Sequence, residues 1–319
     1  MPIGSDVSSA QLAASAAGDV ASAMDLVSLK RKAIEMRRLI LKSVAKAGAG
    51  HIGGPLSATD LLIALYFHEL KLDPTRPDWE DRDRFILSKG HSSIALYTVL
   101  ALRGYMPVSE LDTFDAIDSR LQGHPDMTKL PGVDMSSGSL GVGFSPAVGM
   151  AIGARLLRKS FRAWAMLGDG EIQEGQVWEA AFIAARYKLD NLTAILDYNK
   201  LQQYGWAGTE TPRRPRISIE DPAAKFAAFG WNTIEIDGHD FSQILGAFAL
   251  AKSTVGQPTI IIANTVKGKG ISFMENEYGW HAKPPSKDEL AAALAELDAA
   301  ERLLNAPTAS PAASGSKGE

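Results

Sequence analysis

An acidic residue and an amide residue stand where a metal ion and a diphosphate could be held together. Asp169 lies between Gly168 and Gly170 directly after a strand-like apolar segment, and Asn199 follows the next such segment. A carboxylate beside an anion is unfavourable unless a cation lies between them, and Mg²⁺ binds a few protein oxygens together with phosphate oxygens. The backbone carbonyl of Leu201 could complete the ligand set. The spacing therefore predicts a site for Mg²⁺, or for Ca²⁺ or Mn²⁺ as substitutes, at Asp169, Asn199 and Leu201, although each motif alone would suit an ordinary turn or a solvated loop.

Glycines flank the predicted metal ligand, and a helix is expected to follow it. Gly168 and Gly170 allow the backbone to turn sharply and to approach a ligand closely. The helix predicted over roughly residues 174–188 would direct its first N–H groups toward the same place, which favours an anion. Both features are consistent with a diphosphate beside the metal.

Four of the six histidines stand in glycine-containing loops. Residues that bind ligands are found in such loops more often than on apolar helix faces. Any one of these histidines alone would suit a structural or solvated position. The four candidates are His51, His91, His124 and His281. His68, within a predicted helix, and His239, in a turn after a predicted strand, are expected to be structural.

Short apolar segments alternate with helical patterns along the chain. This alternation predicts a doubly wound, mostly parallel α/β sheet with helices on both faces. Ligands of such sheets lie beyond the carboxyl ends of the strands, which is where Asp169 and Asn199 fall. The expected strands cover residues 84–87, 162–167, 192–197, 231–236 and 259–263. The expected helices run from Leu26 to Gly48, over 59–69, up to Arg103, from Ser145–Pro146 onward, and over 174–188, 241–252 and 287–304.

The composition excludes several kinds of site and partner. The 319 residues include no cysteine, which rules out disulfides, thiolate metal sites and cysteine nucleophiles. With 33 basic and 37 acidic residues, the net charge of −4 is too small to suggest a nucleic-acid or membrane partner. The longest apolar runs are strand-sized, and the first residues lack the features of a targeting segment. We therefore expect a cytoplasmic protein that binds neither nucleic acid nor membranes.

The two ends of the chain differ in composition from its centre. Residues 1–24 are rich in Ala and Ser and are expected to form a flexible arm. Residues 305–319 are rich in Pro, Ser, Gly and Ala and are expected to be a disordered tail. One ligand-binding domain is predicted between them, over residues 25–304.

The segment from Gly168 to Asn199 resembles the signature of thiamin-diphosphate enzymes. Its residues 170–202, GEIQEGQVWEAAFIAARYKLDNLTAILDYNKLQ, are similar to transketolase in particular. The resemblance implies the thiamin-diphosphate-binding fold, with thiamin diphosphate held through Mg²⁺. It also implies a reaction in which a two-carbon ketol unit passes from a ketose phosphate to an aldose acceptor.

The resemblance also assigns roles to residues of this chain. It implies that Asp169, Asn199 and the Leu201 carbonyl bind the metal, and that Gly168, Gly170 and Asn199 contact the diphosphate. The loop 137–143 is similar to a GPLGQG segment of the family, with Ser139 and Val142 in place of proline and glutamine. Backbone contacts of Gly138 and Leu140 with the cofactor ring are therefore expected. Glu174 matches a glutamate that helps to link the paired sites near a subunit interface.

The histidines also match those of the family. The resemblance implies that His91 and His281 hold diphosphate oxygens, and that His51 and His124 contact sugar hydroxyls. Ketol transfer requires protons to move to and from several hydroxyls, and histidine can exchange protons near neutral pH. All four are therefore expected to be catalytic.

The resemblance covers residues from about 26 to 304, only half of a full-length transketolase. In that family a pyrimidine-binding domain supplies an activating glutamate, aromatic stacking and arginines for the sugar phosphate. The residues after Thr265 are too few for that domain. We therefore expect the N-terminal subunit of a split transketolase, which assembles as α2β2 with a C-terminal partner subunit. The chain is expected to be inactive without that partner.

Several alternatives remain open on the sequence. The α subunit of a 2-oxo-acid dehydrogenase shares Gly168-Asp169-Gly170 and Asn199, but is not expected to carry the four histidine loops. Deoxyxylulose-phosphate synthase is normally a longer chain, and a non-catalytic assembly subunit would not need to keep these residues. A nucleotide-binding site is rejected, because neither 141–143 nor 268–270 completes a dinucleotide or P-loop motif.

Overall fold

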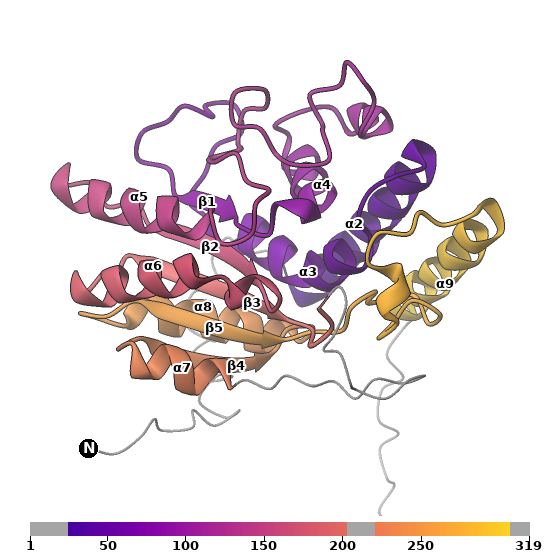
Figure 1. Cartoon of the computed structure of the whole chain (residues 1–319). Helices are drawn as coiled ribbons and strands as arrows, with labels where there is room; N and C mark the ends of the chain where they lie inside the picture. Colours follow the sequence, from indigo (N-terminus) through magenta and orange to yellow (C-terminus); the bar gives the residue numbers. More distant parts are fainter. Residues whose placement is uncertain (1–24, 203–220, 307–319) are drawn as a thin grey trace, which may run out of the picture.

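A five-stranded parallel sheet lies at the centre of the described part of the chain (Figure 1). The structure is a computed structural model, and it describes residues 25–202 and 221–306. The strand order is β1-β2-β3-β5-β4, and every neighbouring pair is parallel. The strands are β1 (Arg84–Leu87), β2 (Ala163–Gly168), β3 (Leu192–Tyr198), β4 (Asn232–Asp237) and β5 (Thr259–Asn264). The predicted α/β fold with a mostly parallel sheet is confirmed.

Helices cover both faces of this sheet. One face shares a hydrophobic cluster with α5 (Phe144–Leu156), α6 (Gly175–Arg186) and α7 (Pro222–Ala228). The other face shares a cluster with α2 (Leu26–Ala47), α3 (Gly53–Ala64), α4 (Ser93–Arg103), α8 (Phe241–Ser253) and α9 (Lys287–Asn305). In β5, Ile260 and Ile262 face the first cluster, whereas Ile261 and Ala263 face the second. A strand covered on both faces has no polar side, which is why its sequence reads as a continuous apolar run.

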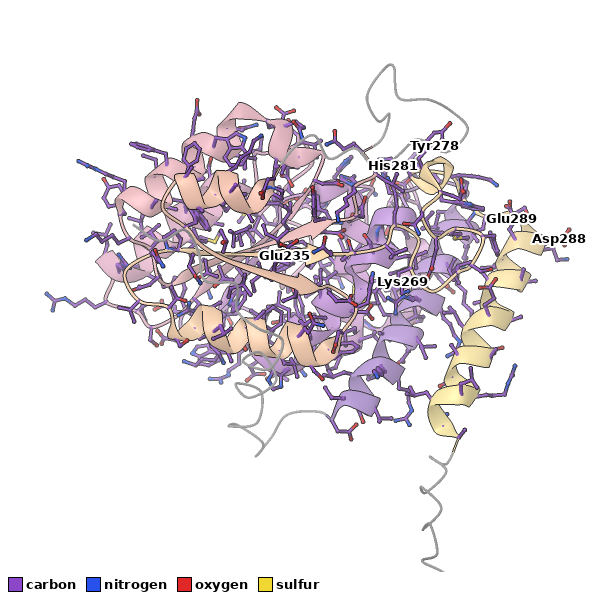
Figure 2. All side chains as sticks on the ribbon, turned by 90° about the horizontal axis from the view of Figure 1, so that it is seen from below. Glu235, Lys269, Tyr278, His281, Asp288 and Glu289 are labelled. Atoms are coloured by element: carbon purple, nitrogen blue, oxygen red, sulfur yellow. The ribbon has the colours of Figure 1, made fainter. Side chains whose placement is uncertain are left out.

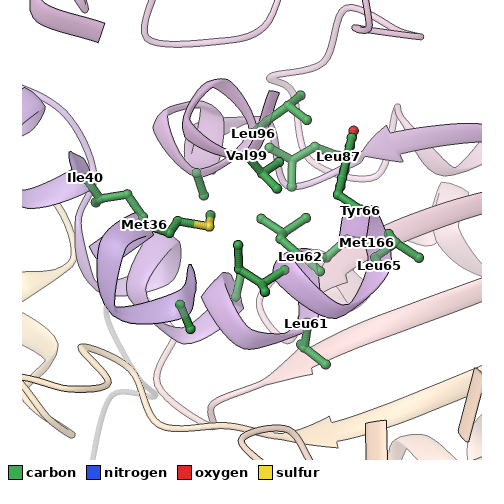
Figure 3. Packing of buried hydrophobic residues seen from close by; sticks show 14 of the residues in the cluster. Met36, Ile40, Leu61, Leu62, Leu65, Tyr66, Leu87, Leu96, Val99 and Met166 are labelled. Atoms are coloured by element: carbon green, nitrogen blue, oxygen red, sulfur yellow. The ribbon is translucent and has the colours of Figure 1, made fainter. Parts of the chain in front are cut away.

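The second cluster is a close-packed core between helices and sheet (Figure 3). Figure 3 shows the part of this cluster that comes from α2, α3, η1, α4 and the first two strands, and this part fixes the helices that precede β1 against the sheet. Among them are Met36, Ile40, Leu61, Leu62, Leu65, Tyr66, Leu87, Leu96, Val99 and Met166.

Two helices begin earlier than the sequence pattern predicts. The expected helix at 59–69 begins at Gly53 and continues as a π-helical turn, η1 (Leu65–Glu69). Pro55 is tolerated there because the first N–H groups of a helix have no acceptor within the helix, so a missing N–H costs little. The helix expected from Ser145 begins at Phe144, with Gly143 as its N-cap and no side-chain cap. Ser145 therefore lies inside the first turn of the helix.

Short helical turns complete the connections between the main elements. Four of them are 3₁₀ turns: η2 (Gly90–Ser92), η3 (Val108–Thr113), η4 (Glu171–Gln173) and η5 (Tyr278–Trp280). The turns η2, η4 and η5 lie in segments that follow strands, where the predicted site residues are found.

The two ends of the described chain lie against each other. In Figure 1 the yellow helix α9 lies beside the indigo helix α2. Arg38 of α2 contacts Asp298 at 2.8 Å and Glu301 at 2.6 Å, and Arg31 donates to Asn305 at 2.9 Å. The predicted arm 1–24 lies outside the described residues, as does the predicted tail except for residues 305 and 306. No helix in the described part of the chain is long and apolar enough to span a membrane.

Candidate functional site

A cavity of about 240 Å³ lies beyond the carboxyl ends of β1, β2, β3 and β5. Segments that follow all four strands contribute to its lining, together with the start of α3 and the loop before α5. Every site residue predicted from the sequence except Glu174 lines it. These are His51, His91, His124, Gly138, Leu140, Gly168, Asp169, Gly170, Asn199, Leu201 and His281. Residues more than two hundred positions apart in the sequence therefore meet in one place.

The predicted metal ligands lie at the ends of β2 and β3. Asp169 is buried, and its Oδ1 accepts a hydrogen bond from the Gly170 N–H at 2.8 Å. Its buried Oδ2 has no hydrogen-bond partner among the described residues. Asn199 Oδ1 accepts from the Leu201 N–H at 3.0 Å, because Lys200 adopts a left-handed conformation (φ 63°) that folds the chain back.

The surroundings of Asp169 suit a bound cation. Burial and the nearby Asp197 raise the pKa of the Asp169 carboxyl to about 6. A buried carboxylate oxygen without a partner is costly unless a positive charge compensates it. Among the described residues no three His, Cys, Asp or Glu side chains gather to hold a metal. The predicted set differs from such clusters, because its other ligands are an amide and a backbone carbonyl.

The two glycines beside Asp169 leave space at the cavity. Neither has a positive φ, so the backbone turn itself does not require glycine. A Cβ at Gly168 would meet only the Lys89 side chain, at 3.5 Å, and one at Gly170 would meet Gln202 at 3.6 Å. These are ordinary contacts. A sharp backbone turn, as expected from the sequence, therefore does not explain the glycines at positions 168 and 170. Close approach of a ligand to the backbone does explain them.

Three of the four candidate histidines form one group. The ring centroids of His51 and His91 are 4.9 Å apart, those of His51 and His281 are 5.0 Å apart, and those of His91 and His281 are 5.5 Å apart. Burial and the neighbouring lysines lower the pKa of His91 to about 2 and that of His281 to about 3. All three imidazoles of the group are therefore neutral at physiological pH, since the pKa of His51 is also lowered, chiefly by burial. His124 lines the same cavity, but it is exposed.

Two buried lysines in the cavity lining were not predicted. Lys89, at the end of β1, forms an ion pair with Asp197 of β3. Burial alone would raise the pKa of Asp197, but Lys89, Ser57 and Thr265 outweigh it and lower that pKa. Lys267, after β5, contacts no carboxylate of the described residues: its Nζ lies 2.8 Å from the Leu201 carbonyl oxygen and 2.8 Å from His281 Nδ1. Burial lowers the pKa of Lys267 to about 8.

Glu171 connects three parts of the site. It is buried, and its carboxylate accepts hydrogen bonds from the Ser88 hydroxyl, from the Gly141 N–H at 2.8 Å and from the Gly168 N–H at 3.1 Å. It therefore ties the loop 137–143 to the ends of β1 and β2. Glu174, the glutamate predicted from the sequence, is exposed and occupies the N-cap position of α6 without a capping hydrogen bond from its side chain. Its expected role near a subunit interface remains a prediction.

The unpredicted lining residues share a reason for being missed. They are Gly54, Lys89, Glu171, Gln202 and Lys267. Most of these residue types are common on solvated surfaces, so only their burial in the folded chain distinguishes them. Two signals were present in the sequence: Lys89 lies between Ser88 and Gly90 directly after a strand, and Lys267 lies shortly after the apolar run 259–263.

Comparisons with known proteins agree with this geometry. Residues 29–303 match the family described as transketolase, thiamine diphosphate binding domain. The chain is 44% identical over 272 residues to the 6-deoxy-6-sulfo-D-fructose transketolase subunit SqwG of Clostridium sp. (strain MSTE9), covering 85% of this chain and 97% of that subunit. It is 38% identical over 274 residues to a subunit of the apulose-4-phosphate transketolase of Phocaeicola vulgatus, covering 86% of this chain and 95% of the relative.

Solved structures show the same arrangement in a longer chain. The transketolase from Leishmania mexicana matches with a TM-score of 0.79 and 30% sequence identity. That match covers 85% of this chain but only 41% of the other. The chain thus spans less than half of this structural relative and nearly all of the two subunits.

Proposed function

This chain belongs to the transketolase family, as a subunit that carries the thiamin-diphosphate-binding domain, and we propose that its cavity holds the metal and diphosphate end of that cofactor for ketol transfer. The observation that carries the proposal is the cavity itself. It brings a buried carboxylate oxygen without a partner among the described residues together with three neutral histidines and two buried lysines, beyond the ends of four strands.

The metal would be held by the oxygens of Asp169, Asn199 and Leu201. The unpartnered Oδ2 of Asp169 supports this assignment, because a cation would compensate its charge. Lys267, His91 and His281 line the same cavity and would neutralise or donate to diphosphate oxygens. Gly138 and Leu140 would contact the cofactor through their backbone, and the loop that carries them is held by Glu171 through Gly141.

When bound, thiamin diphosphate supplies the carbon nucleophile for cleaving a ketose beside its carbonyl. The protein residues would bind and orient the substrate and exchange protons with it. Neutral imidazoles suit this task, because a neutral ring can accept a proton at one nitrogen and donate from the other. His51 would serve the hydroxyls nearest the cofactor, and the exposed His124 those nearer the mouth of the cavity.

A second polypeptide would complete the site. The two subunit relatives are covered almost fully by this chain, whereas the single-chain transketolase is more than twice as long as the matched part. We propose that a C-terminal subunit supplies the pyrimidine-binding domain with its activating glutamate, in an α2β2 assembly located in the cytoplasm. Glu174, exposed beside the cavity, would lie at the contact between subunits.

The substrate is proposed as a ketose that carries an anionic terminal group, most simply a ketose phosphate. One relative is named for a sulfo-sugar and the other for a sugar phosphate. Both names describe a sugar with an anionic group, although the group itself differs. The cavity described here would bind the common ketol end, and the partner would bind the distinctive end.

The test is reconstitution of the enzyme with its partner. The full chain would be mixed with the pyrimidine-domain subunit, thiamin diphosphate and Mg²⁺, and assayed with a ketose phosphate, a 6-sulfo-ketose or pyruvate as donor. We expect transfer of a two-carbon unit to an aldose from one of the two ketoses and no turnover of pyruvate. Decarboxylation of pyruvate without ketol transfer would instead identify the subunit of a 2-oxo-acid enzyme.

A further inference from the structure

The segment that carries Lys267 is held on both sides by one hydrogen-bond network. The Val266 N–H donates to His239 Nε2 at 2.8 Å. Three residues further on, the Lys269 carbonyl accepts from Arg37 Nε at 3.0 Å. Lys267 lies between these two attachment points. Figure 2 shows Lys269 and His281 on this connection between β5 and α9.

The same network joins its two attachment points through one carboxylate. Asp60 of α3 accepts from both terminal nitrogens of Arg37, at 3.0 and 2.7 Å, and lies 2.7 Å from His239 Nδ1. Arg37 is 6% exposed and Asp60 is 5% exposed. A bidentate arginine–carboxylate pair in a buried site has little geometric freedom. The anchor of the segment is therefore the rigid contact between α2 and α3.

The hydrogen bonds of His239 determine its tautomer. Nε2 accepts from a backbone N–H and so carries no proton, which leaves the proton on Nδ1. Nδ1 then donates to Asp60. One neutral imidazole thus bridges the Asp60 carboxylate and the backbone beside Lys267. Each ring nitrogen has a fixed role, Nδ1 as donor and Nε2 as acceptor.

The neighbours of the segment approach it closely at both of its ends. A Cβ on Gly238 would lie 2.5 Å from Thr265 Cγ2. Gly270 has φ 97°, and a Cβ there would lie 2.9 Å from Arg37 Cδ. A side chain at position 238 would collide with Thr265, and one at position 270 would collide with Arg37. Both positions therefore require glycine.

We infer that His239, Asp60 and Arg37 form a positioning clamp for Lys267. The clamp places the Lys267 ammonium in the cavity, where it also holds the Leu201 carbonyl and His281. None of the three clamp residues lines the cavity. They are positioning residues, and their effect on an anionic ligand passes through Lys267. This inference rests on the proposed function, which assigns the cavity to a diphosphate.

Two variants of His239 separate the two halves of its role. His239→Gln places an amide oxygen where Nε2 stood, so it keeps an acceptor for the Val266 N–H and loses the donor to Asp60. His239→Asn keeps a donor near Asp60 and is too short to reach Val266. If the clamp acts on the segment, the Asn variant is impaired and the Gln variant is rescued. A residue that served only to fill or neutralise the core would show no such order.

The first measurement is the affinity of the full chain for inorganic pyrophosphate with Mg²⁺, by calorimetry. We expect His239→Asn to weaken binding about tenfold, the value of one hydrogen bond, and His239→Gln to stay within about threefold of wild type. The same pair is then made in a Lys267→Met background. There we expect the effect of His239→Asn to disappear, because its route to the ligand is gone. The clamp would be overturned if His239→Asn bound pyrophosphate with wild-type affinity. It would also be overturned if His239→Asn weakened binding as strongly in the Lys267→Met background as in the wild-type background.

The second measurement is independent of any ligand. Hydrogen exchange of the full chain is followed in peptides that cover residues 265–270. His239→Asn should accelerate exchange of this segment while His239→Gln leaves it near wild type, and unchanged exchange in both would overturn the clamp. Failure of pyrophosphate to bind the wild-type chain would instead count against the proposed function, and the exchange result would still decide the inference.

Discussion

Asp169 has opposite effects on the stability of the protein and on the binding we propose. Its carboxylate is buried and one of its oxygens lacks a partner among the described residues, so its charge is uncompensated by hydrogen bonds at that oxygen. Such a group destabilises a folded protein unless a ligand compensates it, and residues of this kind cluster at functional sites. Asp169 thus lowers the stability of the metal-free fold and would strengthen the binding of a cation.

The change Asp169→Asn tests this residue directly. It preserves shape and removes the charge, so Mg²⁺-dependent binding of thiamin diphosphate to the assembled enzyme should weaken by about 100-fold or more, as for loss of a buried charge partner. In metal-free protein the same change should raise the melting temperature by at least about 2 °C, because an unpaired buried charge is removed. Calorimetry and thermal unfolding measure the two effects.

The matched control is Asp118→Asn. Asp118 is exposed, so the same chemical change there should alter neither quantity. If Asp169→Asn bound the cofactor as tightly as Asp118→Asn, Asp169 would not be a ligand of the metal.

At the scale of the elements, strand sequences predict much of the fold and of the site. Each of the five predicted strands is present within one residue at either end. Because parallel strands are buried on both faces, their apolar runs are visible without knowledge of the tertiary structure. Their carboxyl ends meet at one edge of the sheet, so the motifs that follow β2 and β3 are enough to predict a shared site.

The sequence alone could not predict which polar residues become buried between those elements. Glu171 and Glu174 are three residues apart in the same segment, yet only Glu171 is buried and bonded to three neighbouring segments. The 3₁₀ turn η4 makes the difference, because it turns Glu171 inward before α6 begins at Gly175. Turns this short carry no periodic signal. His239 illustrates the same limit, since its partners Asp60 and Val266 are distant in sequence.

The change Glu171→Gln tests the role of this turn in connecting elements. The amide would present a donor to the Gly141 or Gly168 N–H, leaving a buried donor without an acceptor. The free energy of unfolding should fall by about 1–3 kcal/mol, the cost of an unsatisfied buried group. Urea unfolding of the full chain measures it. Glu174→Gln, on the exposed cap of α6, is the control and should stay within about 0.5 kcal/mol of wild type. Equal losses in both variants would contradict the different roles of the two glutamates.

At the scale of the whole molecule, the proposed function makes the cavity only part of an active site. The described residues form the pocket that we propose for the metal and the diphosphate, at one edge of a parallel sheet. The match covers only 41% of the related transketolase from Leishmania mexicana. It covers 97% and 95% of the two related subunits. Division of the enzyme between two chains therefore predicts that binding and turnover depend on assembly.

The prediction at this scale concerns the state of the mixed subunits. Light scattering should show that this chain and the proposed pyrimidine-domain subunit form a complex with two copies of each. The rate of ketol transfer by this chain alone should be at least about 100-fold lower than that of the complex, because the proposed partner would supply the activating acid–base group. Asp169→Asn should assemble normally and remain inactive, since its defect lies in cofactor binding. Full activity of the isolated chain would contradict the division of the site, and an inactive complex of normal size would show that assembly alone does not complete it.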